Sequence, residues 1–153
     1  MGRVTIPWMS WVLVCDGARA LIFRNRGDAE LLDLETIDAL DEPHPRAGEL
    51  GADRPGRVHE SHGEGRSAVA ETDRHEAAEV AFIARVAEQL DRRLADAERK
   101  ALVVVAPPRV LGVLRRCLTP AAQEALTAEI GKDLAHLDTG EIEKRLASAR
   151  TDA

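Results

Sequence analysis

The chain has 153 residues, of which 44% are hydrophobic and 31% charged; this suits one folded domain and excludes wholesale disorder. Its formal net charge of −6 argues against binding a nucleic-acid backbone over the whole surface, although a local basic patch stays open. No apolar run approaches the roughly 18 residues of a membrane span, and no signal-peptide stretch opens the sequence, so we expect a cytoplasmic protein. Cys15 and Cys117 both lie in apolar segments and are expected to be buried free thiols.

The first part of the chain predicts three antiparallel strands. Residues 11–15 (WVLVC) form a continuous apolar run, which is typical of a strand covered on both faces. Asp16-Gly17 is a hairpin turn signal, and residues 18–24 alternate between two faces as a second strand. After a turn at residues 25–28, a third strand is expected over residues 29–34, which completes a meander.

Residues 41–72 break this pattern. Gly, Pro, His, Arg and acidic residues dominate the segment, and apolar residues do not recur at any regular spacing. We expect a long loop here, and a connection of about thirty residues is usually functional or disordered. The domain would then span residues 11–149, with terminal tails at residues 1–10 and 150–153.

Helices and strands alternate after the loop. An apolar stripe from Val80 to Ala97 predicts a long helix, and Asp73 with Glu76 resembles its capping box. Residues 101–106 predict a buried strand that Pro107-Pro108 ends; because a helix precedes it, we expect it to lie parallel to the first strand. Further helices are expected over residues 109–118, from Thr119-Pro120 onward and over 141–149, with a fifth strand at 126–130. This order predicts an α/β domain with a mixed five-stranded sheet and flanking helices, the plan of ribonuclease-H-like domains.

Five stretches together resemble the bacterial host-attachment protein family. They are Val12-Leu-Val-Cys-Asp-Gly-Ala-Arg-Ala-Leu-Ile-Phe23, Asp53-Arg-Pro-Gly-Arg57, Val105-Ala-Pro-Pro-Arg-Val-Leu-Gly112, Lys132-Asp-Leu134 and Glu141-Ile-Glu143. The chain departs from the family at Cys15, where Ala is commoner, and at Val110, where Thr often follows Pro-Pro-Arg. The resemblance implies a role in attachment to host cells. It also implies a fold similar to the middle domain of archaeal and eukaryotic release factors, whose bacterial relatives are thought to act at ribosomes.

The candidate binding site lies where two strands end. In an open α/β sheet, ligands gather outside the carboxyl ends of parallel strands, so Asp16, Pro108 and Arg109 would share one rim. Arg109 would also lie near a helix N-terminus, which favours anions. The alternative interpretation is a proline stop followed by a solvated helix face.

The long loop could contribute to the same site. Arg54 and Arg57 flank Pro55 and Gly56, and the turn that Pro55-Gly56 forms would hold the two guanidinium groups apart and exposed, which suits forked recognition of phosphate or carboxylate; Gly56 is counted with the candidate binding residues. The alternative interpretation is a polar loop without a ligand. Both interpretations remain open at this point.

Metal and nuclease chemistry find little support in the sequence. Six residues could be considered as metal ligands, but they lack a metal-ligand framework, so we assign no metal; they are His59, Glu60, His62, Glu64, His75 and Glu76. Ribonuclease-H chemistry needs several carboxylates around two metal ions, and Asp16 is the sole catalytic candidate at the rim.

Three functions therefore follow from the sequence. The first is a non-enzymatic, release-factor-like module that binds ribosome, tRNA or other RNA through Arg54, Arg57 and Arg109. The second is an interaction protein that contacts another protein during attachment. The third is a hydrolase at the rim. We expect no cofactor and no membrane contact; the first two functions need no catalysis by the chain itself, and both catalysis and the oligomeric state are left open.

Overall fold

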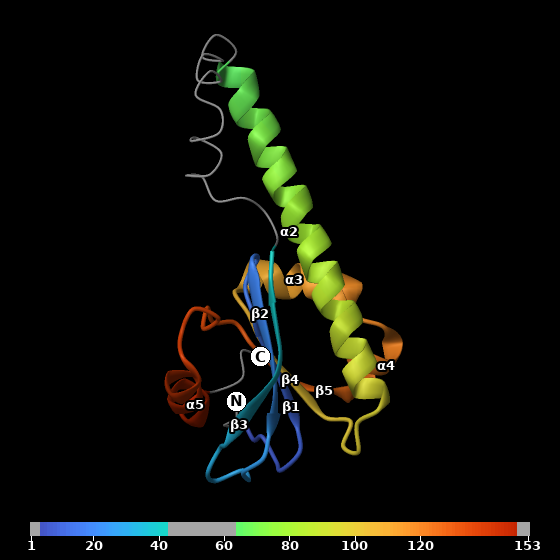
Figure 1. The fold of residues 1–153 in the computed structure, drawn as a ribbon, viewed down its shortest axis with the longest axis vertical. Coiled ribbons are helices and arrows are strands. Elements are labelled where there is room, and N and C mark those ends of the chain that lie inside the picture. Colours follow the sequence, from blue (N-terminus) through green and yellow to red (C-terminus); the bar gives the residue numbers. More distant parts are fainter. Residues whose placement is uncertain (1–3, 43–63, 150–153) are drawn as a thin grey trace.

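The computed structural model describes residues 4–42 and 64–149, with side chains described for 4–42 and 72–149. These residues form five strands and four helices (Figure 1). The strands are β1 (Trp11–Cys15), β2 (Arg19–Asn25), β3 (Leu34–Asp41), β4 (Leu102–Val105) and β5 (Leu126–Ile130). The helices are α2 (Glu64–Ala95), α3 (Pro108–Cys117), α4 (Pro120–Ala125) and α5 (Thr139–Ala147).

The strands form one mixed sheet in the order β3-β2-β1-β4-β5. β1 pairs antiparallel with β2, and β2 pairs antiparallel with β3, which confirms the meander. β4 lies parallel to β1, with Leu13 opposite Val104, and β5 lies parallel to β4. The expected mixed five-stranded α/β sheet, with β1 and β4 as parallel neighbours, is therefore present.

Helices cover both faces of the sheet (Figure 1). α2, α3 and α4 cover one face, where Leu13, Ile22 and Val104 point into a shared apolar core. α5 and the segment that precedes β1 cover the other face, where Val12 and Phe23 are buried. Val104 is 1% exposed, so β4 is buried between the two layers as its apolar run predicts.

The third strand begins later than expected. A third strand over residues 29–34 is wrong, because the chain makes a polar turn there before β3 starts at Leu34. Asp28 Oδ1 accepts hydrogen bonds from the backbone N–H groups of Glu30 and Leu31, both near 2.8–2.9 Å. This side-chain turn competes with strand pairing and leaves Leu31 76% exposed.

The long helix begins earlier than expected. α2 starts at Glu64, so residues 64–72 are helical and the loop expected over 41–72 is wrong for that part; Asp41 likewise belongs to β3. Residues 43–63 lie outside the described residues. Asp73 and Glu76 are interior helix positions and make no capping box. Val80, expected on the buried stripe, is 45% exposed, while Phe82 is fully buried.

Residues near both ends of the described chain pack onto the domain. Val4 and Ile6, within the expected N-terminal tail, are buried against the α5 side of the sheet. The Val4 N–H donates a hydrogen bond to the Ala149 carbonyl at 3.3 Å, and Ala149 is also buried. Val4 and Ala149 therefore join the two ends of the described chain on this side of the sheet.

Polar contacts fix α2 across the sheet. Arg93 binds Asp38 of β3 through two hydrogen bonds of 2.6 and 2.9 Å, and Gln89 adds a third at 3.2 Å. Thr119 donates its hydroxyl hydrogen to Asp91 at 2.7 Å, which joins the helix to α4. The N-terminal residues 64–78 of α2, called the arm below, extend past the end of the sheet (Figure 1). No helix in the described ranges has the length and apolar character needed to cross a membrane.

Candidate functional site at the strand ends

The carboxyl ends of β1 and β4 lie side by side. The two strands are parallel neighbours, so the turn at Asp16-Gly17 and the segment Pro107–Arg109 meet at one edge of the sheet. The sequence predicted this rim, and the strand pairing that it requires is confirmed. The polar groups at the rim nevertheless make contacts that the sequence did not predict.

Asp16 caps the turn between β1 and β2. Its Oδ1 accepts hydrogen bonds from the backbone N–H groups of Ala18 and Arg19, each at 2.8 Å. Its own N–H donates to the Arg19 carbonyl at 2.9 Å. One carboxylate oxygen of Asp16 is thus engaged in holding the turn, a structural role that its position after a strand favours.

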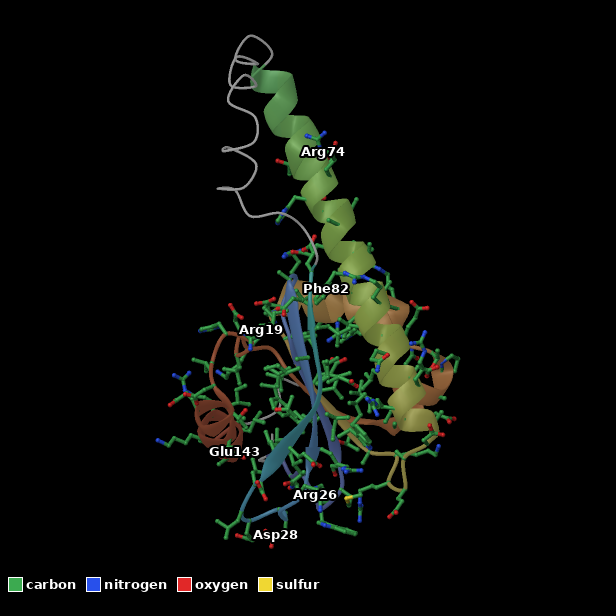
Figure 2. All side chains as sticks on the ribbon, in the orientation of Figure 1. Arg19, Arg26, Asp28, Arg74, Phe82 and Glu143 are labelled. Atoms are coloured by element: carbon green, nitrogen blue, oxygen red, sulfur yellow. The ribbon has the colours of Figure 1, made fainter. Side chains whose placement is uncertain are left out.

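The central contact of the rim is an ion pair between α2 and α3. The Arg109 Nη1 donates to Glu79 Oε1, and its Nη2 donates to Glu79 Oε2 at 3.0 Å. The Glu79 side chain is 12% exposed and the Arg109 side chain 66% exposed. The pair is therefore buried at its carboxylate end and open to solvent at its guanidinium end. Figure 2 labels Phe82, one turn after Glu79, where α2 reaches the sheet, and Arg74 further out on the arm.

Charge and hydrogen bonding shift the pKa values of both partners of this pair. The hydrogen bonds from Arg109 hold the pKa of Glu79 below its ordinary value against the opposing effect of burial. The same contact raises the pKa of Arg109. Glu79 is therefore ionised at neutral pH, and it is a poor proton donor there. Because two-thirds of the Arg109 side chain faces solvent, we expect the pair to contribute about 1–2 kcal/mol, below the range for fully buried charged pairs.

Gly17 makes room for this ion pair. A Cβ atom added to Gly17 would lie 2.1 Å from Glu79 Oε2 and 2.7 Å from Glu79 Cγ. Gly17 has no positive φ angle, so the glycine is needed for space and not for a left-handed backbone. Gly17, Glu79 and Arg109 together join the ends of β1 and β4 to the base of the arm. They are called the clamp below.

A shallow cavity of about 180 Å³ lies next to the clamp. It is lined by Pro108, Leu111, Arg115, Glu129 and Gly131. Arg115 Nε lies 3.0 and 3.1 Å from the two carboxylate oxygens of Glu129, so the charges at its wall neutralise each other. Pro108 occupies the first turn of α3 and has no N–H, which removes one of the donors that an anion would use at this helix end.

The structure brings only part of the predicted site together. Asp16, Pro108 and Arg109 share the rim, whereas Arg54, Gly56 and Arg57 lie outside the described residues. The guanidinium of Arg109 is paired with the Glu79 carboxylate of its own chain, so it is less available to bind an external anion. Convergence of the three arginines stays a prediction.

Sequence reasoning missed Glu79. Its signal is an acid placed three and four residues before Phe82 and Ile83, on the buried face of α2. A carboxylate in such a position needs a partner, and an arginine after a strand-ending proline pair is the kind of residue that provides one.

The cysteines and potential metal ligands add no chemistry to this rim. Cys15 is fully buried, and burial raises the pKa of its thiol to about 12, which keeps it protonated. Cys117 is half-buried and also free. Within the part of the chain whose side chains are described, no three His, Cys, Asp or Glu side chains gather as metal ligands. His59 and His62 lie outside that part.

The family of the chain follows from a comparison with protein-family models. Residues 11–146 match the model described as "Protein required for attachment to host cells". The chain belongs to this family. A search of curated proteins gives no match to this host-attachment protein. Val110, where the family often has Thr, is 1% exposed in the core, so a hydroxyl at that position would not reach the rim surface.

Proposed function

We propose that this host-attachment protein is a non-enzymatic binding module that acts in attachment by contacting another protein. The observation that carries the proposal is the arm of α2. It extends past the sheet, and residues 72–77 are all exposed. The clamp fixes its base through Glu79 and Arg109. A helix held at one end and exposed beyond it presents a defined surface to a partner.

The engaged acids at the rim favour binding over hydrolysis. Asp16 uses one carboxylate oxygen to cap a turn, and Arg109 holds Glu79 in its ionised form. A general acid or base works best with a pKa near the working pH, and the pKa of Glu79 is shifted away from it. The groups available at the rim therefore suit a structural joint.

Site-specific cross-linking tests the proposal. A photoreactive amino acid would replace Arg74 on the arm in living cells, and a matched variant would carry it at Lys144, which is exposed on α5. Figure 2 places Arg74 well beyond the sheet. We expect a defined protein adduct from position 74 and none from position 144. Equal adducts from both positions, or no protein adduct from position 74, would contradict the proposal.

The attachment phenotype provides a second readout. A strain without the gene should adhere less to host cells, and the wild-type chain should restore adhesion. A variant with Arg74, His75 and Glu76 all replaced by Ala should fold and still fail to restore adhesion. We propose a cytoplasmic location, in which case the effect on adhesion is indirect; cell fractionation that finds the chain at the cell surface would overturn this part.

A release-factor-like, ribonuclease-H-like module that binds RNA or the ribosome is the second candidate. It is favoured by the exposure of Arg109: Glu79 takes two of the five guanidinium N–H donors, and the remaining ones can reach a phosphate. Replacing Arg57 and Arg109 by Ala changes the net charge from −6 to −8 and should weaken RNA association and flatten its salt dependence.

The matched control for that experiment replaces Arg92 and Arg99 by Ala, which likewise removes two positive charges. Equal weakening by the control pair would show that net charge alone acts. Absence of RNA or ribosome binding by the wild type at low salt would remove the second candidate and leave the protein contact.

A further inference from the structure

We draw no further inference here: the strongest candidate, the outer edge of strand β3, is already closed where it begins by the Glu143 carboxylate on the Leu34 N–H, and nothing in the described residues shows what would pair with the rest of that edge.

Discussion

Replacing Arg109 by Ala would test whether the clamp holds the arm to the sheet. The change removes both hydrogen bonds to Glu79. The Glu79 carboxylate, whose side chain is only 12% exposed, then loses its partner. Buried unpaired charges are costly, but solvent can reach this site through the space that Arg109 leaves. We therefore expect the free energy of unfolding to fall by about 1–2 kcal/mol at pH 7, which lowers Tm by about 2–8 °C for a domain of this size.

The pH dependence of this effect has a definite sign. The pKa of Glu79 is lower in the folded chain than in the unfolded chain, so the pair stabilises the fold above the unfolded value of about 4.3. That contribution is lost as pH falls through the folded pKa. The difference in Tm between wild type and Arg109→Ala should thus be full at pH 7 and shrink below about pH 4.

Circular dichroism at 222 nm during heating would measure both Tm values. The matched control is Arg116→Ala, an exposed arginine on the same helix, which should change stability by less than about 0.5 kcal/mol. Equal Tm values for the Arg109 and Arg116 variants would refute the reasoning. A difference that persists unchanged at acid pH would show that Glu79 is not the partner that matters.

Three further predictions follow from the same structure. Gly17→Ala should lower Tm, because its Cβ would overlap the Glu79 carboxylate, and the loss should be smaller in the Arg109→Ala background, where Glu79 is free to move. Val104→Asp should remove several kcal/mol and yield insoluble protein, because the carboxylate would lie 1% exposed between two helical layers; a soluble variant with wild-type Tm would show that β4 is not central. A thiol reagent should label Cys117 before Cys15 in the native chain, and the two rates should become equal in denaturant; equal rates in the native state would contradict the burial of Cys15.

The parts of the fold that the sequence predicted well are those where burial alone decides the structure. The short apolar runs of β1 and β4 favour strands covered on both faces, and both are buried throughout; the Pro107-Pro108 stop marks where β4 ends. Parallel pairing of these strands follows from the helix between them. Family membership also followed from the sequence, since the motifs keep their order along the chain.

The parts that the sequence predicted poorly are those where a polar side chain decides the structure. The apolar residues 31 and 32 favour an early third strand. The Asp28 carboxylate instead accepts hydrogen bonds from the backbone N–H groups of Glu30 and Leu31, which holds this segment in a turn. The first turns of α2 lack a regular apolar stripe in the sequence, and residues 72–77, where side chains are first described, are all exposed. The partner of Arg109 lies 30 positions away in sequence, and no local pattern links it to Glu79.

The arm can also be regarded as a helix–coil system with one end pinned. A peptide helix of fifteen residues is marginal in water because its first turn must nucleate without tertiary contacts. In this chain the clamped turn at Glu79 serves as a permanent nucleus, so the arm needs only to propagate from it. Its helical content then depends on intrinsic propensity and on whatever binds it. Substitutions along the arm can therefore alter how strongly a partner is held without altering how stably the domain folds.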